Sequence, residues 1–297
     1  MIRTLENGFK VVGGTDGIDR LFFDSSRASE CISFAKANGY KRIMLDPSNG
    51  FTVSNLDEVT PLKDYIEGLI ISSEKIRYDR LDVFNKLKIL GTPDNGKDII
   101  DFINFPDLEI LTCDYSSRLK GLEKCRKLKL LALTNYKPLG GDMEELLLNY
   151  PSLIELRLYL TNIKYLNGIE NFKSLKTLDL YRAPKLTSIK AITKIDLEEV
   201  FIEKCKSIND YENLGKVKSL KKIRISESGE IKTLSFLKSL TNLEFLSFWG
   251  TNVLDGNLDY CEGIPYVGFD DKRHYNHKGK FFEESNELYR LKNKPQR

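Results

Sequence analysis

Two consecutive segments decide the fold: LIELRLYLTNIKYLNGIENFKS (residues 153–174) and LKTLDLYRAPKLTSIKAITKID (residues 175–196). Each begins with an apolar residue that is followed three and five positions later by two more, the pattern LxxLxL. The last pair of this triplet alternates with other residues, which is typical of a short strand with one face in a core. Such a strand cannot bury its apolar face alone, so the repetition predicts stacked coils whose strands pair as a parallel sheet.

The triplet recurs along the chain and sets the expected number of coils. In the second half its spacing is 22, 22, 23, 23 and 21 residues, at Leu153/Leu156/Leu158, Leu175/Leu178/Leu180, Leu197/Val200/Ile202, Leu220/Ile223/Ile225, Leu243/Leu246/Phe248 and Ile264/Val267/Phe269. In the first half the spacing is looser and the register is chosen to fit, at Ile18/Leu21/Phe23, Tyr40/Ile43/Leu45, Ile66/Leu69/Ile71, Phe84/Leu87/Ile89, Leu108/Leu111/Cys113 and Leu128/Leu131/Leu133. The sequence therefore predicts about twelve repeats over residues 18–271.

The segments between the triplets close each coil. Ile163, Leu166, Ile169 and Phe172 recur at intervals of three, which favours tight 3-10 turns facing the core. Some earlier return segments are more helical in pattern, at residues 27–38, 97–103 and 142–148.

These features resemble the 22-residue class of leucine-rich-repeat proteins, as in bacterial internalins and phosphatase-regulatory subunits. The resemblance is specific over about residues 153–263. It implies an α/β fold, a right-handed solenoid or horseshoe with a parallel sheet on the concave face and short helices and 3-10 turns on the convex face. The family usually has Asn in the turn after each strand; the residues there in this chain are Thr161, Ala183, Cys205, Ser228 and Thr251. Thr, Cys and Ser can donate to the same turn carbonyls, whereas Ala cannot.

A solenoid needs covered ends, because its terminal coils otherwise expose core. We expect residues 1–17 to form an N-terminal cap. Residues 272–297, which contain eight basic and three acidic residues, are expected to form a C-terminal capping turn with a solvated basic tail. No linker rich in Gly, Ser or Pro interrupts the chain, so residues 1–297 are predicted to form a single leucine-rich-repeat domain.

Composition narrows the class of protein. The 46 Lys and Arg nearly balance the 43 Asp and Glu, so the chain lacks the basic field of a nucleic-acid binder. No apolar run of about 18 residues is present, so neither a membrane span nor a membrane partner is expected. The five cysteines lie far apart without a CxxC motif, which favours a reducing compartment. We expect a cytoplasmic monomer.

One segment has the spacing of a phosphate-binding loop. GTPDNGKD (residues 91–98) approaches GxxxxGK[ST], but Asp98 stands where a magnesium-binding Ser or Thr belongs and Pro93 lacks an N–H donor. We interpret the segment as a repeat turn, with Asp98 near the start of a helix as a favourable partner of the helix dipole.

The two histidines, His274 and His277, lie close to Asp270 and Asp271 in the sequence. A pair at i and i+3 could hold a metal ion, but the lysines and the arginine beside it would repel a cation. The favoured interpretation is a polar cap over the last coil, with no metal and no cofactor. Because no Ser-His-Asp or Cys-His set is present, we expect no enzymatic activity. A metal- or phosphate-dependent enzyme that uses the His cluster is the alternative.

Strand residues that flank the inward apolar pair point to the concave face, where large anchors are typical of protein interfaces. The predicted partner-binding residues are Glu155, Arg157, Tyr159, Asp179, Tyr181, Glu199, Phe201, Lys222, Arg224, Phe245, Trp249 and Tyr266. Their aromatic members could instead only stabilise the sheet by stacking on one another. The same face is more apolar in the early coils, at Phe22, Met44, Ile70, Ile110 and Leu130, so it is either covered there or forms part of a groove.

The pattern predicts a non-catalytic protein-binding scaffold. By analogy with immunity proteins of contact-dependent toxins that use such repeats, the partner could be a toxin domain and the protein a bacterial inhibitor. A secreted effector or adhesin is a further alternative.

Overall fold

The structure, a computed structural model, describes residues 1–14, 17–146 and 150–294. The chain divides into two compact units. Unit 1 comprises Met1–Thr134 with Tyr150–Ser152, and unit 2 comprises Asn135–Asn149 with Leu153–Arg297. The single domain expected over residues 1–297 stays a prediction, and each unit is described here by itself.

Unit 1 is built on a sheet with the strand order β1-β2-β3-β4-β5-β6-β8-β10. Its strands are β1 (Ile2–Thr4), β2 (Lys10–Gly13), β3 (Asp19–Phe22), β4 (Arg42–Leu45), β5 (Gly68–Ile71), β6 (Ile89–Thr92), β8 (Ile110–Asp114) and β10 (Leu130–Thr134). From β3 onward the pairing is parallel, whereas β1 and β2 join antiparallel to one another and to β3. The segment expected to cap the N-terminus, residues 1–17, therefore extends the sheet as an antiparallel pair, with residues 15–16 outside the described part.

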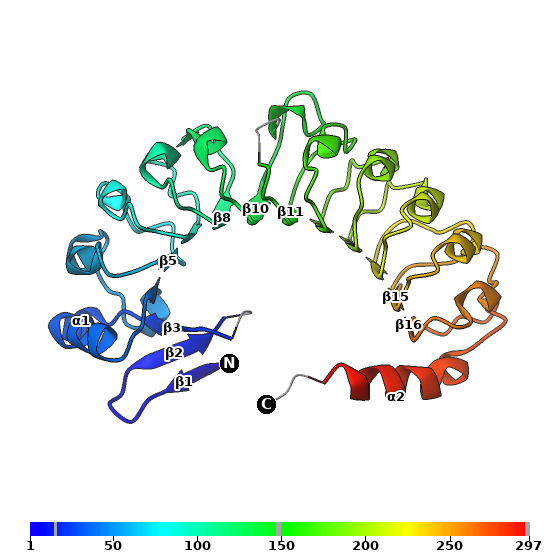
Figure 1. Ribbon diagram of the computed structural model, residues 1–297, viewed down its shortest axis with the longest axis horizontal. Helices are drawn as coiled ribbons and strands as arrows, with labels where there is room; N and C mark the ends of the chain where they lie inside the picture. The colour runs from blue at the N-terminus through cyan, green and yellow to red at the C-terminus, as the bar shows by residue number, and fades with distance from the viewer. Residues whose placement is uncertain (15–16, 147–149, 295–297) are drawn as a thin grey trace. The chain divides into compact units, whose positions relative to one another are not determined.

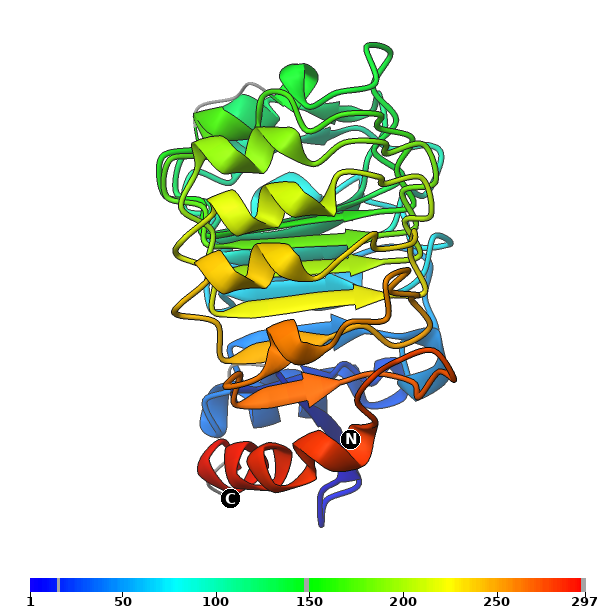
Figure 2. The ribbon, with the colours of Figure 1, turned by 90° about the vertical axis from the view of Figure 1, so that its right-hand side faces the viewer.

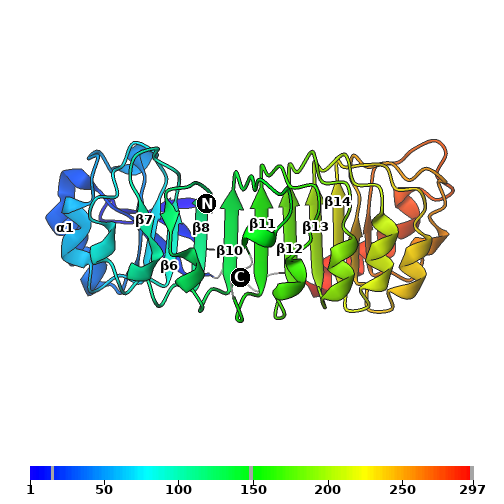
Figure 3. The same cartoon turned by 90° about the horizontal axis from the view of Figure 1, so that it is seen from above.

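Unit 2 is a stack of parallel strands that all point the same way (Figures 2 and 3). The strands are β11 (Glu155–Tyr159), β12 (Thr177–Tyr181), β13 (Glu199–Glu203), β14 (Lys222–Ser226), β15 (Phe245–Ser247) and β16 (Tyr266–Gly268). Each strand pairs with the next in sequence order, and equivalent residues of successive coils are direct neighbours.

Short helices make the return path of each coil. The α-helices of the described residues are α1 (Ala28–Ala37) and α2 (Glu283–Lys292), and a small second sheet pairs β7 (Ile100–Asp101) with β9 (Leu119–Lys120). In unit 2 the strands lie on the inner side of the coils and the 3-10 helices on the outer side (Figure 1). The 3-10 helices are Ser25–Arg27, Pro47–Asn49, Asp57–Leu62, Leu81–Val83, Phe102–Asn104, Leu122–Lys124, Glu144–Leu146, Ile169–Asn171, Lys190–Lys194, Tyr211–Lys216, Ser235–Ser239, Asp259–Cys261 and Gly279–Phe282. Within the described residues, no helix has both the length and the apolar character that crossing a membrane requires.

The apolar triplets form the core of unit 2. Every member of the triplets predicted from residue 153 onward is buried, from Leu153 to Phe269. In β11 to β13 the burial alternates strictly along the strand, because the second and fourth positions face the core and the first, third and fifth face outward. The side-chain period of the sequence is thus the period of the structure.

Two triplet assignments in unit 1 are wrong. Leu69 of β5 pairs with Leu90, so the fourth triplet is Leu87/Leu90/Thr92 rather than Phe84/Leu87/Ile89. The local sequence has apolar residues that fit either triplet, and only the backbone pairing distinguishes the two. Ile18, placed in the first triplet, is 51% exposed because no earlier parallel coil precedes it.

The helix expected over residues 97–103 is also wrong. Ile100–Asp101 forms β7 and pairs with β9, and a 3-10 turn begins at Phe102 with Asp101 accepting a hydrogen bond from the Ile103 N–H. Adjacent β-branched residues at 99 and 100 favour the extended backbone there. Of the segment 142–148, residues 144–146 form a 3-10 helix, and 147–148 lie outside the described residues.

Side-chain donors hold the turns after the strands, as the substitutions for Asn predict. The Thr161 hydroxyl donates to the Tyr136 carbonyl at 2.6 Å, and the Ser228 hydroxyl donates to the Ser226 carbonyl at 2.8 Å. The Cys205 thiol makes a longer contact of 3.4 Å to the Glu203 carbonyl. Ser228 and Cys205 thus bond to the carbonyl two residues earlier, whereas Thr161 bonds to a carbonyl 25 residues earlier in the chain.

A residue with left-handed backbone follows each long strand of unit 2. Leu160, Arg182, Lys204 and Glu227 have φ of 54°, 52°, 56° and 47°. The backbone N–H of each donates to the carbonyl of a residue in the next coil; Leu160, for example, donates to Tyr181 at 2.8 Å. One further backbone hydrogen bond between coils therefore stabilises the left-handed conformation, which non-glycine residues seldom adopt.

The C-terminal cap closes the last strand with a side-chain amide. Asn286 of α2 is buried; its Nδ2 donates to the Val267 carbonyl at 2.8 Å and its Oδ1 accepts from the Val267 N–H at 2.7 Å. These are the two hydrogen bonds that another strand would make. The amide thus satisfies the backbone at the edge of the sheet, where unpaired groups invite aggregation.

Replacing Asn286 by Ala should destabilise the cap by about 2 kcal/mol, because the Val267 N–H and C=O lose their partners in a buried position. Hydrogen exchange of the Val267 amide is the direct measurement, and we expect faster exchange in Asn286→Ala. Asn293→Ala is the matched control, since Asn293 donates only to the exposed end of α2 at Tyr289. Equal protection of Val267 in the two variants would contradict the assignment.

All five cysteines are reduced and buried. Burial raises the pKa of Cys205 to about 11 and the pKa values of Cys125 and Cys261 to about 12. The nucleophilic thiolate is therefore scarce at neutral pH as well as inaccessible.

We expect no thiol of the folded protein to react quickly with an aromatic disulfide reagent at about pH 8. After unfolding in guanidinium chloride, all five should react. Rapid labelling of a thiol in the native protein, identified by mass spectrometry, would show that its coil opens.

Candidate protein-binding surface

The strands of unit 2 align their outward side chains in three rows, which we term the strand face of unit 2. The rows are Glu155, Thr177, Glu199, Lys222, Phe245 and Tyr266; Arg157, Asp179, Phe201, Arg224, Ser247 and Gly268; and Tyr159, Tyr181, Glu203 and Ser226. Eleven of the predicted partner-binding residues belong to these rows. Trp249, the remaining one, lies two residues beyond the end of β15. The structure therefore brings the predicted set together outside the core, and its role in binding stays a prediction.

The first two strands hold their polar side chains in fixed positions. Arg157 donates to Glu155 at 2.6 Å, and the Tyr159 hydroxyl donates to Asp179 Oδ2 at 2.8 Å. Burial raises the pKa of Asp179, and burial together with the bond to Asp179 raises the pKa of Tyr159 to about 12. A partner would meet these groups already oriented.

Aromatic rings and cations alternate across the middle of the face. The rings of Tyr159 and Tyr181 meet edge to face at 5.9 Å, and the Arg182 guanidinium lies 5.3 Å from the Tyr181 ring. The Arg224 guanidinium lies 5.1 Å from the Phe201 ring. Such pairs are attractive because a cation meets the negative face of the ring.

Charge on this face is largely paired. Lys222 donates to Glu199 at 2.7 Å, just as Arg157 binds Glu155. Arg224 is exposed and forms no ion pair with any residue that the structure describes. Its guanidinium therefore keeps hydrogen-bonding capacity for a partner.

The last two strands use their aromatics differently, because α2 packs on them. Phe245 and Tyr266 stack in parallel with ring centres 4.5 Å apart, and the Tyr289 ring of α2 lies 6.0 and 5.6 Å from them. The Arg290 guanidinium lies 5.4 Å from the Tyr266 ring. The basic tail expected to be solvated is thus in part a helix seated on the face, and the prediction is corrected accordingly.

Tyr289 and Arg290 are residues of this surface that sequence analysis missed. The available signal is the spacing of Phe282, Asn286 and Tyr289, which places them on one side of a helix. The polar Asn286 interrupts the apolar pattern on that side of the helix, so the pattern alone does not predict that the helix packs on the sheet.

Trp249 is the most exposed aromatic near the strand face, at 48%. It lines a hollow of about 610 Å³ together with Arg224, Phe245 and Tyr266. Gly268 leaves room for the indole, since a Cβ there would lie 3.2 Å from Trp249 Nε1. The aromatic end of the face therefore offers a shaped, open depression.

Unit 1 has its own hollow on the strand side. A pocket of about 340 Å³ is lined by Ile70, Gly91, Ile110, Thr112 and Arg20, among others. The absence of a side chain at Gly91 deepens it between neighbouring strands. A groove is therefore present at Ile70 and Ile110, whereas Phe22, on an earlier strand, is buried.

The loop at residues 91–98 is a structural turn. The Arg77 Nε–H lies 2.9 and 2.8 Å from the two Asp98 oxygens, Arg77 Nη2 donates to Oδ1 at 2.5 Å, and the Tyr78 N–H donates to Oδ2 at 2.7 Å. The hydrogen bond from Arg77 is the main reason that the pKa of Asp98 lies far below its usual range. The expected position at a helix start is wrong, because β7 follows instead.

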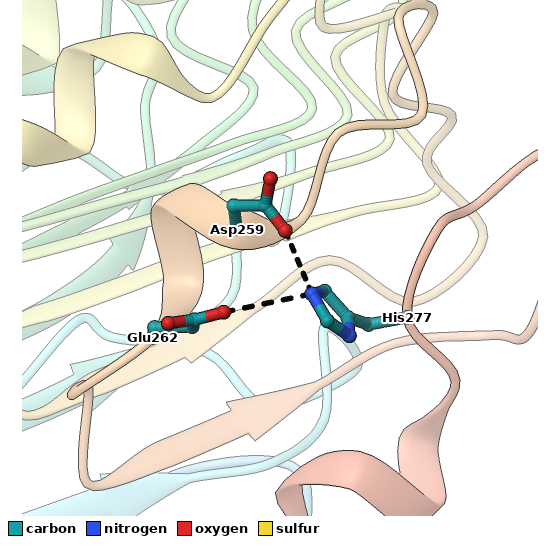
Figure 4. Close-up of side chains that lie close together, drawn as sticks. All are labelled: Asp259, Glu262 and His277. Atoms are coloured by element: carbon teal, nitrogen blue, oxygen red, sulfur yellow. Dashed lines mark hydrogen bonds and ion pairs between the residues drawn. The ribbon is translucent and has the colours of Figure 1, made fainter.

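The two histidine side chains contact different residues. His274 Nε2 lies 2.9 Å from the Val253 carbonyl, whereas His277 Nε2 lies 2.7 Å from Asp259 Oδ1 and 3.6 Å from Glu262 Oε1 (Figure 4). The aspartates adjacent in sequence serve the backbone: Asp270 accepts from the Gly250 N–H and Asp271 from the Gly279 N–H. The two histidines therefore do not form an i, i+3 metal pair with these aspartates.

Comparison of the sequence with protein-family models and with curated proteins finds no match. Solved structures with a similar fold include the internalin InlF of Listeria monocytogenes, at 15% identity over 72% of this chain and 77% of that chain, with a TM-score of 0.43. A leucine-rich-repeat protein of Leptospira interrogans is similar at 14% identity over 76% of each chain, with a TM-score of 0.35. The functional domain of InlJ from Listeria monocytogenes is similar at 14% identity over 80% of this chain and 48% of that chain, with a TM-score of 0.47.

The class of protein follows from the coils themselves. Repeated LxxLxL strands in a parallel sheet, closed by 3-10 return segments, define a leucine-rich-repeat solenoid, so the predicted fold is confirmed. Assignment to the 22-residue class stays a prediction.

Proposed function

We propose that this leucine-rich-repeat protein is a non-catalytic scaffold that binds a protein partner on the strand face of unit 2. The observation that supports this most is the ordered group of outward aromatics and cations around Tyr181, Phe201, Arg224 and Trp249. Large aromatic and Arg side chains on a rigid support are the usual anchors of protein interfaces.

Preorganisation adds to the argument. Tyr159 is held by Asp179, and Arg224 lies against Phe201, so binding freezes few additional rotamers. The side chains of such a surface therefore lose little conformational entropy when a complex forms.

The packing of α2 narrows the proposed surface. Phe245 and Tyr266 stack with Tyr289, so sheet and cap stabilisation accounts for part of their burial. The centre of the proposed contact therefore lies at Trp249, Arg224 and Tyr181.

Within this class we propose a bacterial immunity protein that acts as a monomer in the cytoplasm and inhibits a toxin domain, without nucleic acid or membrane as a partner. The buried free thiols fit a reducing compartment. The near balance of charge fits a protein partner better than a polyanion.

The test replaces Trp249 and Tyr181 by Ala, singly and together, and measures binding to the product of the neighbouring gene. Loss of an anchor worth about 2 kcal/mol weakens binding about 30-fold. Titration calorimetry or surface plasmon resonance gives the affinity.

Tyr165→Ala is the matched control, because Tyr165 is a 46% exposed aromatic outside the rows of the strand face. Its affinity should equal that of the unmodified protein. If Trp249→Ala and Tyr181→Ala bind as well as the control while remaining folded, the strand face is not the contact surface.

A further inference from the structure

The last coil and the C-terminal cap bring three metal-ligand side chains together. Asp259 and Glu262 come from the 3-10 turn of the last coil, and His277 comes from the cap loop (Figure 4). One ligand atom from each lies within 4.8 Å of the other two. From these positions we infer a site for a divalent transition-metal ion, with Zn²⁺ as its best fit.

The distances suit a tetrahedral ion after small side-chain movements. Ligand atoms bound to Zn²⁺ at about 2.0–2.1 Å lie roughly 3.4 Å apart in a tetrahedron. His277 Nε2 lies 2.7 Å from Asp259 Oδ1 and 3.6 Å from Glu262 Oε1, on either side of that separation. Rotation of two exposed carboxylates brings all three atoms into place and leaves a fourth position for water.

Contacts outside the ligand set hold the two segments together before any ion binds. Asn276 Oδ1 accepts from the Leu258 N–H at 2.8 Å, and the Asn276 N–H donates to the Gly256 carbonyl at 3.1 Å. Asn276 Nδ2 also donates to Asp259 Oδ1 at 2.8 Å, which orients that carboxylate. Outer contacts of this kind raise metal affinity because they fix the ligands.

The imidazole is similarly fixed. The His277 ring stacks on the Phe281 ring at 4.0 Å between centres, with Nε2 directed at the two carboxylates. A nitrogen ligand with two carboxylates favours Zn²⁺ over Mg²⁺ or Ca²⁺, which prefer oxygen alone.

The cations near this cluster are engaged elsewhere. Lys278 Nζ donates to the Tyr275 carbonyl at 3.1 Å and to the Lys272 carbonyl, and Lys238 Nζ lies 4.9 Å from the centre of the Tyr260 ring. Cys261, in the same turn as the two carboxylates, is buried in the core and does not compete as a ligand. Neither ammonium group is paired with Asp259 or Glu262, so both carboxylates stay available to an ion.

A bound ion would link the cap to the last coil, because its ligands come from both. The cap encloses the aromatic core at the end of unit 2, where Phe269 meets Tyr275 and Phe282 at 5.9 Å. Because the ligands converge only when the cap is docked, the ion binds the folded state and raises its stability.

The experiment titrates the metal-free full chain with Zn²⁺ by calorimetry and with Co²⁺ by absorption spectroscopy. We expect one ion per chain, visible d–d bands of Co²⁺ without a thiolate charge-transfer band, and a higher melting temperature with Zn²⁺. His277→Ala should weaken binding about 100-fold or more, since it removes the one nitrogen ligand.

His274→Ala is the matched control and should retain the affinity, because the His274 ring contacts the Val253 carbonyl and the neighbouring Tyr275 ring and is not part of the ligand cluster. Asp259→Asn combined with Glu262→Gln should abolish binding with little effect on folding, and serves as the test if His277→Ala does not fold. Absence of saturable Zn²⁺ or Co²⁺ binding, or equal binding by the carboxamide variant, would overturn the proposal and leave an ion pair only.

Discussion

In-register pairing of parallel strands is the constraint on which unit 2 depends. Because Glu155 pairs with Thr177, Thr177 with Glu199 and Glu199 with Lys222, the same position of every coil meets the same position of the next. The apolar triplets thereby merge into one core, and the residues between them merge into rows. A shift by one residue in any coil would exchange core and surface along the whole strand.

The same constraint explains which parts of the fold the sequence predicts well. In unit 2 the spacing is nearly constant, so the triplets from Leu153 onward identify both the strands and the outward residues. In unit 1 the spacing varies, and apolar residues at 84, 87, 89 and 90 permit two registers. Backbone pairing to Leu69 selects Leu90, and that information lies in another coil rather than in the local pattern.

Contacts between segments that are far apart in the chain could not be predicted from the sequence. Asp259 and His277 are separated by 18 residues and share no repeat position, so only the docked cap reveals their contact. Tyr289 likewise reaches Phe245 because α2 crosses the last strands. Periodicity orders side chains within the coils, whereas the cap obeys no period and its partners follow from three-dimensional packing.

The amide of Asn286 has a consequence for how such a protein can change its length. Its two hydrogen bonds recognise the main chain of Val267 and require no particular side chain there. The aromatic contacts of the cap, with Phe245, Tyr266 and Phe269, likewise come from the last two coils. Gain or loss of an internal coil during evolution leaves this terminus intact, and the number of coils is free to follow the size of the partner.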